Sequence, residues 1–324
     1  MKTVLITGAF GFVGMNLSRH LAARGFTMWA LDIAGAPGHV YEHVFNWGEL
    51  ATIPWQQVDA IVHLAGKAHD TKNAADPQSY FDINTGLTEK ILDACGKGGH
   101  LPQARKFILF SSVKAAADSV DGVLREDHPP APKTPYGQSK LEAERCVFNA
   151  MEQRPGALRG YVLRFCMIHG PGNKGNLNLL YNIARRGVPW PLGAYENLRS
   201  FASVQNVCAV VEGLLNNNVH PGVYHVADDE PLSTNTLIRL MAESMNRQPR
   251  ILRVSPRLIR AAAKIGDVLH LPLNTERLRK LTESYIASNE KIKAALQWQK
   301  MPLPALDGMR ATLASFAKQT KGSK

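Results

Sequence analysis

Apolar residues along the chain form short uninterrupted runs that alternate with longer segments in which apolar positions recur every three or four residues. The short runs predict buried strands, at Val4–Thr7, Phe26–Ile33, Asp59–Leu64, Lys106–Ser111 and Gly160–Phe165. The periodic segments predict helices, at Phe12–Arg24, Asn84–Cys95 and Tyr136–Met151. Because strands buried on both faces need helices on both sides, the pattern predicts an α/β fold with a doubly wound parallel sheet.

The pattern changes after His169, where a glycine-rich loop precedes a predicted helix at Leu177–Arg186. Beyond about Asp228 the chain is rich in helical patterns and in Lys and Arg. We therefore expect a second, smaller lobe, built from the C-terminal part of the chain with contributions from segments that leave the sheet.

The stretch T-G-A-F-G-F-V-G places Gly8, Gly11 and Gly14 directly between the first predicted strand and the first predicted helix. Gly8 would allow a tight turn, Gly11 a close backbone approach to a pyrophosphate, and Gly14 close packing of the helix on the sheet. The phosphates would then lie at the positive end of the helix dipole. In this strand–turn–helix context the spacing predicts a dinucleotide-binding loop.

The choice of dinucleotide depends on Asp32, which lies at the end of the second predicted strand. A carboxylate at this point can accept hydrogen bonds from the ribose hydroxyls of the adenosine. A 2′-phosphate would instead meet a like charge, and no Lys or Arg follows in I-A-G-A-P-G. The sequence therefore predicts NAD rather than NADP.

Tyr136 and Lys140 are four residues apart and therefore share one face of a helix. A lysine ammonium about 4 Å from the phenol contributes about 4 kcal/mol at an effective dielectric constant of about 20. This energy would lower the pKa of the phenol by about three units from its usual value near 10, into the range of a general base. Ser112, which follows the fourth predicted strand, could hydrogen-bond the substrate oxygen as it becomes a carbonyl.

These motifs, in this order, resemble the extended short-chain dehydrogenase/reductase family, and within it the UDP-glucose/UDP-N-acetylglucosamine 4-epimerase-like subgroup of nucleotide-sugar epimerases and dehydratases. The resemblance runs from Met1 to about Trp298 and rests on T-G-x-x-G-F-V-G, H-L-A-G at 63–66, D-I-N-T-G at 82–86, F-S-S at 110–112, P-Y-G-Q-S-K at 135–140 and R-S-F at 199–201. It implies a Rossmann-type lobe that binds NAD, at residues 1–165 and roughly 201–226. A smaller C-terminal lobe, at residues 166–200 and 227–324, would bind a nucleoside-diphosphate sugar.

The resemblance also implies a role for individual residues. Tyr136 would be the acid/base, Lys140 would orient it and hold the nicotinamide ribose, and Ser112 would contact the reacting oxygen. Arg199 would meet the pyrophosphate of the sugar nucleotide, and Lys114 would lie beside the sugar. Further cofactor contacts would come from Gly8, Gly11, Phe12, Val13, Gly14, Asp32, Ala65 and Gly66.

The pair Val113-Lys114 restricts the reaction. A 4,6-dehydratase of this family carries an Asp-Glu pair directly after its Ser or Thr, which supplies the extra acid and base for eliminating water. Here an apolar residue and a cation take those two positions, so we do not expect dehydration. The chain also has Met167 where many family members have an asparagine near the sugar, and Asn46 near the place of a common adenine-contacting aspartate.

Two reactions remain open. In a 4-epimerase, Tyr136 removes the proton of the C4 hydroxyl while hydride passes to NAD, and the hydride later returns to the opposite face of the 4-keto sugar. In a 4-keto reductase, Tyr136 donates a proton while external NADH reduces a UDP-4-keto-6-deoxy sugar. We favour C4 epimerisation of a UDP-hexose or UDP-N-acetylhexosamine for surface polysaccharide synthesis. The alternative of another class is a catalytically silent NAD-binding regulatory module, which typically lacks the tyrosine or the lysine that this chain keeps.

The formal charge of +11 is concentrated in residues 251–324, which carry 14 Lys and Arg against 5 Asp and Glu. No nucleic-acid-binding motif accompanies this charge, so we expect an anionic substrate and a weak attraction, through Arg257, Arg260 and Lys264, to an anionic membrane surface. Apolar runs are too short for a transmembrane span or a secretory leader. The four cysteines lack the spacing of a metal site. We therefore expect a cytoplasmic enzyme without a metal, and the resemblance implies a homodimer.

Overall fold

The computed structural model describes residues 2–68, 76–97, 105–173, 175–269 and 274–321. Its centre is a seven-stranded sheet whose neighbouring strands are all parallel. The strand order is β11-β7-β5-β4-β1-β2-β3, with β1 at Thr3–Thr7, β2 at Thr27–Asp32, β3 at His43–Asn46, β4 at Ala60–His63, β5 at Arg105–Ser112, β7 at Leu158–Phe165 and β11 at Gly222–Val226. The direction of strand succession reverses between β1 and β4, which confirms the predicted doubly wound sheet.

All five predicted strands lie in this sheet, within two residues of their expected bounds. The sequence pattern did not predict β3 and β11. Strand β3 lies at the edge of the sheet and has mostly exposed residues, so it has no apolar run. In β11 the buried His225 interrupts the apolar pattern.

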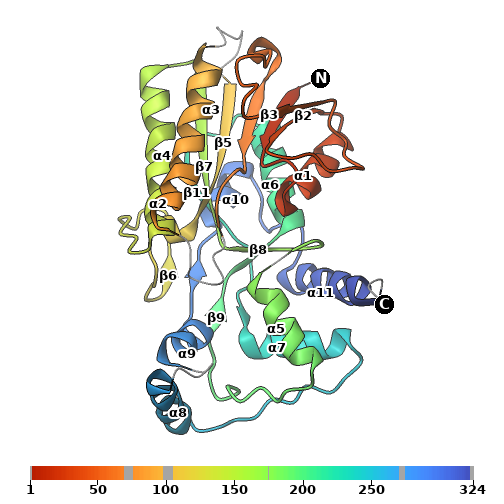
Figure 1. Cartoon of the computed structure of the whole chain (residues 1–324), viewed down its shortest axis with the longest axis vertical. Coiled ribbons are helices and arrows are strands. Elements are labelled where there is room, and N and C mark those ends of the chain that lie inside the picture. The colour runs from red at the N-terminus through yellow and green to blue at the C-terminus, as the bar shows by residue number, and fades with distance from the viewer. Residues whose placement is uncertain (1, 69–75, 98–104, 174, 270–273, 322–324) are drawn as a thin grey trace.

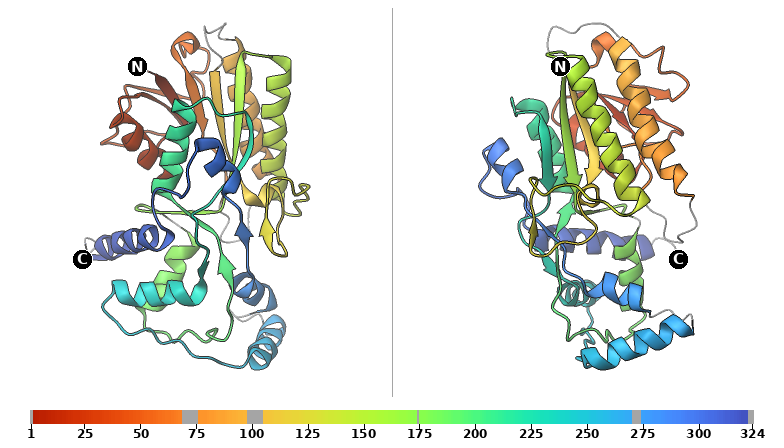
Figure 2. Two further views of the ribbon diagram at one scale, coloured as in Figure 1. Left: turned by 180° about the vertical axis from the view of Figure 1, so that it is seen from behind. Right: turned by 90° about the vertical axis from the view of Figure 1, so that its left-hand side faces the viewer.

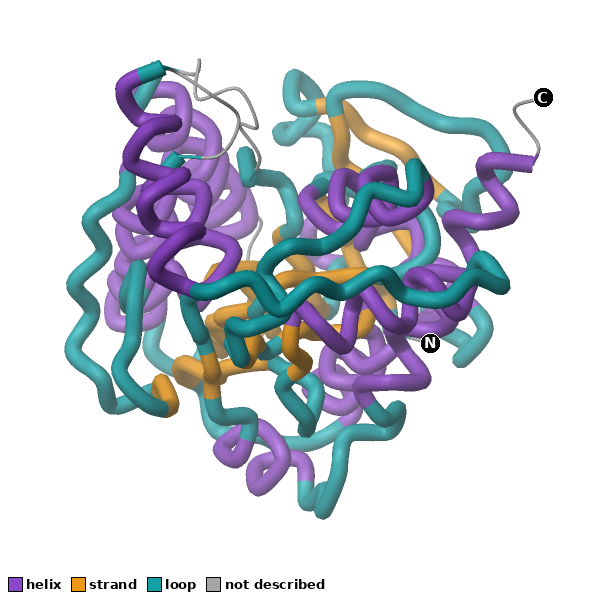
Figure 3. The backbone as a smooth tube through the Cα atoms, turned by 90° about the horizontal axis from the view of Figure 1, so that it is seen from below, coloured by secondary structure: helices purple, strands orange, loops and turns teal. Residues whose placement is uncertain are grey.

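Helices cover both faces of the sheet, as Figures 1 and 3 show. They are α1 at Phe12–Ala22 and α6 at Val204–Asn216 on one face, and α3 at Gly86–Lys97 and α4 at Pro135–Gln153 on the other. Successive residues of a strand point to opposite faces. Accordingly Val4 and Ile6 of β1 pack in the core with α1 and α6, whereas Leu5 packs in the core with α3 and α4.

The chain before α3 differs from the predicted continuous helix Asn84–Cys95. The short α2 (Gln78–Tyr80) leads into a π-helical turn at Phe81–Thr85, and α3 begins only at Gly86. The wider π turn contains Asn84, whose side-chain nitrogen donates to Ser139 Oγ of α4 over 2.9 Å. The distortion therefore joins this segment to α4.

The second lobe lies beyond the ends of β5 and β7 and is built from helices and two-stranded sheets (Figures 1 and 2). Its strands are β6 at Val123–Leu124, β8 at Met167–His169, β9 at Leu198–Arg199, β10 at Phe201–Ser203, β12 at Leu232–Ser233 and β13 at Ile286–Ala287. Its helices are α5 at Asn176–Arg185, α7 at Thr234–Ser244, α8 at Pro256–Val268, α9 at Thr275–Thr282 and α11 at Ala305–Lys321. None of the described helices has the length and apolar character that a membrane span requires.

Helix α10 (Glu290–Leu296) returns to the sheet. Its Ile292 and Leu296, together with Met301, belong to the core that contains α1 and α6. Residues 290–301 thus pack against the sheet, although they lie within the segment that we expected in the smaller lobe.

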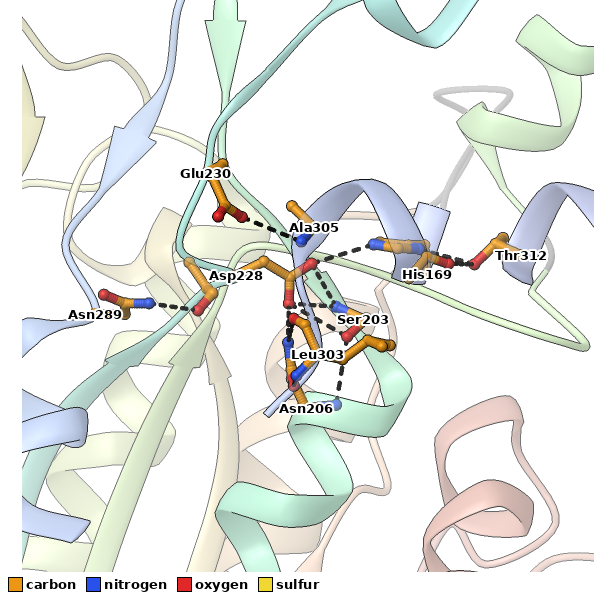
Figure 4. Close-up of polar contacts among 11 residues, drawn as sticks. His169, Ser203, Asn206, Asp228, Glu230, Asn289, Leu303, Ala305 and Thr312 are labelled. Atoms are coloured by element: carbon orange, nitrogen blue, oxygen red, sulfur yellow. Dashed lines mark hydrogen bonds and ion pairs between the residues drawn. The ribbon is translucent and has the colours of Figure 1, made fainter. Parts of the chain in front are cut away.

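A buried polar cluster joins the two lobes (Figure 4). The carboxylate of Asp228 accepts hydrogen bonds from the Ser203 backbone nitrogen (3.0 Å) and from Asn206 Nδ2 (2.7 Å) at the start of α6. His169 Nε2 lies 3.5 Å from the same carboxylate, and His169 Nδ1 lies 2.9 Å from Thr312 Oγ1 of α11. The C-terminal helix is thereby fixed to the ends of β8 and α6.

A buried ion pair fixes α4 to the sheet. Arg164 of β7 contacts Glu144 of α4, with 2.7 Å between Nη2 and Oε2, and both side chains are almost fully buried. The Ser111 hydroxyl of β5 donates to Glu144 Oε1. These three groups set the position of α4 relative to the ends of β5 and β7.

A second polar chain, centred on His63, lies on the face of the sheet that α3 and α4 cover. The Ala65 N–H donates to Thr7 Oγ1, which leaves the Thr7 hydroxyl to donate to His63 Nδ1. Thr88 donates to the Asn84 carbonyl, so Thr88 Oγ1 accepts from His63 Nε2–H. These bonds require the neutral imidazole. Burial, assisted by the charge of Lys140, lowers the pKa of His63 to about 3.

Breaking the ion pair from one side should destabilise the fold. We expect Arg164→Met to lower the free energy of unfolding by about 3–5 kcal/mol, because it leaves the Glu144 carboxylate buried without its partner. The double variant Arg164→Met, Glu144→Leu should recover most of this loss. Urea unfolding measures both, and the exposed pair Arg145–Glu142 of the same helix provides a control, for which Arg145→Met should cost less than about 1 kcal/mol. Strictly additive losses in the double variant would contradict the assignment.

Acid should destabilise the fold through His63. Below its unfolded pKa of 6.5 the unfolded chain binds a proton at this residue, whereas the folded chain does not until about pH 3. The free energy of unfolding should therefore fall by up to about 1.4 kcal/mol per pH unit across that window, on account of this one group. When the pH is lowered from 6.5 to about 5, the free energy of unfolding of His63→Asn should fall by about 2 kcal/mol less than that of the unchanged protein. Parallel stability–pH curves would show that His63 is not the titrating group.

Candidate active site

The loop between β1 and α1 has the form that a pyrophosphate requires. Gly8 has a φ of +65°, and a Cβ there would lie 2.8 Å from the Ala65 nitrogen. A Cβ on Gly14 would lie 2.4 Å from the Ala9 oxygen. Helix α1 begins after Gly11 without a side-chain cap, so its first N–H groups remain available to an anion. These residues fit the phosphates of a dinucleotide.

Asp32 lies beside this loop at the end of β2. Its Oδ2 accepts a hydrogen bond from the Phe10 N–H (2.8 Å), and its Oδ1 accepts one from the Ile33 N–H (2.7 Å). Both bonds fix the carboxylate next to the turn. It remains partly accessible, as an acceptor for ribose hydroxyls would be.

Helix α4 positions Tyr136 and Lys140. Thr134 caps it by accepting the Gly137 N–H (3.2 Å), and Pro135 occupies its first turn. Asp118 holds the residues just before the helix, because its carboxylate accepts the Lys133 N–H over 2.6 Å. The first turn therefore has a fixed position relative to the loop that follows β5.

Lys140 lies against the end of β5, and its Nζ donates to the Phe110 carbonyl over 3.0 Å. Burial lowers the pKa of Lys140 to about 8, and the Glu144 carboxylate opposes this change. A Cβ on Gly66 would lie 2.9 Å from Lys140 Nζ and 2.8 Å from Asn84 Oδ1. Lys140 and Gly66 are thus neighbours, although the sequence placed them 74 positions apart.

The protonation of Tyr136 differs from the expectation. We expected Lys140 to lower the pKa of the phenol, but burial raises the pKa of Tyr136 above its usual value, and a hydrogen bond with the Ser112 side chain opposes the rise. The ammonium of Lys140 is directed to a backbone carbonyl instead. Desolvation therefore outweighs the attraction that the sequence argument used.

A cavity of about 480 Å³ lies between the two lobes. Of the residues that we predicted to act in catalysis or binding, six line it: Phe12, Val13, Ser112, Lys114, Tyr136 and Arg199. Met167, which takes the place of the family asparagine, lines it as well. The others, which are Gly8, Gly11, Gly14, Asp32, Ala65, Gly66 and Lys140, lie outside its lining. Within this second group, Gly8 lies next to Ala65, and Gly66 lies next to Lys140.

Two cations line the cavity: Lys114, in the turn that follows β5, and Arg199, at the end of β9 in the second lobe. Lys114 Nζ donates to the Asp118 carbonyl and lies 4.2 Å from the centre of the Tyr285 ring. Arg199 Nε donates to the Glu283 carbonyl over 3.1 Å. Burial lowers the pKa of both Lys114 and Arg199. Together they make the cavity attractive to an anionic ligand.

Sequence reasoning missed Tyr285, which connects the lobes at the site. Its hydroxyl donates to the Ala117 carbonyl (2.7 Å) and lies 3.1 Å from the Val113 carbonyl. It thereby holds the turn that follows Ser112. Glu283 and Cys166 also line the cavity and were missed. None of these three belongs to a recognisable motif, and only the fold brings them to Ser112.

Residues 4–227 match the model of the NAD dependent epimerase/dehydratase family. The chain is 25% identical to a UDP-glucose 4-epimerase of Vibrio cholerae over 329 residues, which cover 97% of this chain and 95% of the relative. It is 30% identical to the N-acetyl-alpha-D-glucosaminyl-diphospho-ditrans,octacis-undecaprenol 4-epimerase of Escherichia coli O157:H7 over 256 residues, or 76% of this chain and 73% of the relative.

The fold is similar to that of a solved structure, MoeE5 in complex with UDP-glucuronic acid and NAD, with a TM-score of 0.76. The two chains are 21% identical, and the match covers 98% of this chain and 99% of MoeE5. The predicted Rossmann-type fold and the resemblance to the extended short-chain dehydrogenases/reductases are both confirmed. This chain belongs to the NAD dependent epimerase/dehydratase family, and its cofactor is NAD.

Proposed function

We propose that the protein epimerises a nucleoside-diphosphate sugar at C4, through transient oxidation to a 4-keto sugar. A UDP-hexose or a UDP-N-acetylhexosamine is the substrate in this proposal. The main support for this proposal is one cavity beside the dinucleotide loop. Ser112 and Tyr136 line this cavity together with two cations, Lys114 and Arg199.

Tyr136 is the acid/base in this mechanism. It removes the proton of the C4 hydroxyl during oxidation and returns a proton to the same oxygen during reduction. Ser112 hydrogen-bonds that oxygen while it is a carbonyl, and Lys140 holds the nicotinamide ribose. Bound NAD supplies the acceptor, and afterwards the donor, of one hydride, so the whole cycle leaves the substrate redox-neutral.

The chemistry of the cavity supports C4 epimerisation over dehydration. Elimination of water needs an additional acid–base pair beside the sugar, and Val113 and Lys114 follow Ser112 instead. Glu283 is the single carboxylate that lines the cavity among the described residues. The wall with Lys114 and Arg199 suits a diphosphate.

The carrier of the sugar can be a nucleoside or a lipid, since both types of relative named above act on a sugar diphosphate. We propose the nucleoside diphosphate, bound by residues 166–200 and 227–324, with the dinucleotide on residues 1–165 and roughly 201–226. We further propose that the enzyme is a cytoplasmic homodimer, paired through α3 and α4, and acts in surface polysaccharide synthesis.

The direct test is an assay of UDP-glucose, UDP-galactose and their N-acetylated forms with purified protein and no added reductant. The expected result is conversion to the C4 epimer, with close to one NAD retained per chain. Activity that appears only with added NADH and a 4-keto-6-deoxy sugar would replace this proposal with the 4-keto reductase. Absence of turnover with both substrate classes would favour the silent NAD-binding module.

Removing the Tyr136 hydroxyl should strongly reduce turnover without loss of the cofactor. We expect Tyr136→Phe to reduce kcat by about 10²–10⁴-fold, because proton transfer at the C4 oxygen loses its acid/base. The NAD content after purification should not change. The matched control is Tyr195→Phe, because Tyr195 lies outside the cavity lining. This variant should keep full activity. A Tyr136→Phe enzyme with normal kcat would exclude this role.

Removing the cation at position 114 should weaken substrate binding. We expect Lys114→Met to raise KM for the sugar nucleotide roughly tenfold or more, because a charge-assisted contact is lost. The effect on kcat should be smaller, since Tyr136 and Ser112 remain. Lys114→Arg should restore part of the affinity, and an unchanged KM in Lys114→Met would show that this side chain only supports the turn.

A further inference from the structure

Helix α8 (Pro256–Val268) is attached to the protein through one narrow face. Only Ile259, Ala263 and Gly266 of this helix are buried. Their spacing of four and three residues places them on a single face of the helix. The rest of the helix surface is therefore exposed to solvent.

The outward surface of α8 carries an apolar stripe. Its members lie along one flank of the helix, beside the buried face, and they are Leu258, Ala261, Ala262, Ile265 and Val268, followed directly by Leu269. The four large side chains among them are between 58% and 76% exposed. Single exposed apolar residues are common on proteins, but a contiguous row of them marks an interaction surface.

Three cations lie along one edge of the stripe. Arg257, Arg260 and Lys264 are all exposed, and none forms an ion pair with another residue in the described ranges. Residues 251–283, which contain α8 and α9, hold seven Lys and Arg against three Asp and Glu. The surface around the stripe is thus basic.

The position of α8 in the fold leaves it accessible to a partner surface. The helix lies at the end of the second lobe that is farthest from the sheet (Figures 1 and 2). Its Asp267 accepts the Thr275 N–H at the start of α9 over 3.0 Å. At the other end of α9, Arg199 of the cavity wall donates to the Glu283 carbonyl. Helix α9, which has eight residues and is therefore about 12 Å long, connects α8 to that wall.

We propose that α8 docks on the surface of an anionic phospholipid bilayer. The stripe would enter the boundary between headgroups and acyl chains, and the three cations would meet headgroup phosphates. An apolar face flanked by Lys and Arg is the pattern of helices that lie in the membrane interface, and the cations favour anionic lipids. A second copy of this chain would present the same positive charge, which opposes self-association through α8. This proposal does not depend on which sugar reaction the cavity performs.

Co-sedimentation of the full chain with vesicles tests the proposal. The expected result is binding to phosphatidylcholine vesicles that contain about one third phosphatidylglycerol, and little binding to pure phosphatidylcholine. Binding should weaken as salt is raised, because the attraction is screened. Two variants separate the apolar and the charged contributions to binding. The double variant Ile265→Ser, Val268→Ser removes apolar contact. The triple variant Arg257→Gln, Arg260→Gln, Lys264→Gln removes positive charge.

Each variant should reduce the bound fraction roughly tenfold or more, while the activity on soluble substrate stays unchanged. The controls are Leu179→Ser, which removes a 54% exposed apolar residue of α5, and Arg239→Gln, which removes an exposed cation of α7; both should bind like the unchanged protein. Equal binding to neutral and anionic vesicles, or variants that bind normally, would overturn the proposal. Dissociation of an oligomer by Ile265→Ser with Val268→Ser, without vesicle binding by the unchanged protein, would assign the stripe to self-association instead.

Discussion

The ion pair between Arg164 and Glu144 is the interaction on which the geometry of the proposed catalytic site depends. It ties α4 to β7, and the Ser111 hydroxyl extends the contact to β5. Helix α4 carries Tyr136 and Lys140, while β5 ends at Ser112. Because both partners are buried, a shift of α4 along the sheet would leave two charges without compensation. This buried contact therefore sets the distance between Tyr136, the proposed acid/base, and Ser112, which we propose to meet the reacting oxygen.

The second constraint is the junction of the lobes. Asp228, His169 and Thr312 fix the C-terminal helix to the carboxyl ends of the strands, and Tyr285 holds the turn after Ser112 from the other lobe. The cavity is formed where these contacts meet. A ligand placed there would touch both lobes. In the proposed mechanism, the junction that holds the lobes in place therefore also brings the cofactor and the sugar together.

Much of this arrangement could be predicted from local pattern. The five strands predicted from apolar runs, the glycine turn at Gly8 and the helix with Tyr136 all depend on neighbours in the sequence. Strands β3 and β11 could not be predicted because an exposed edge and a buried His225 conceal the apolar pattern. The pKa of Tyr136 was expected in the wrong direction because a sequence shows a nearby lysine but not the burial that outweighs it. Tyr285 and Glu283 reach the cavity through long-range packing alone, and no local signal marks them.

The measurement that tests the central claim most directly is the fate of hydrogen at C4. A UDP-hexose or UDP-N-acetylhexosamine labelled with deuterium at C4 is incubated with the purified enzyme without added nucleotide. A redox-neutral cycle predicts the C4 epimer with the deuterium still on C4, because the same hydride leaves and returns. An epimer that has lost its deuterium, or no epimer from either class of UDP-sugar, would contradict the account.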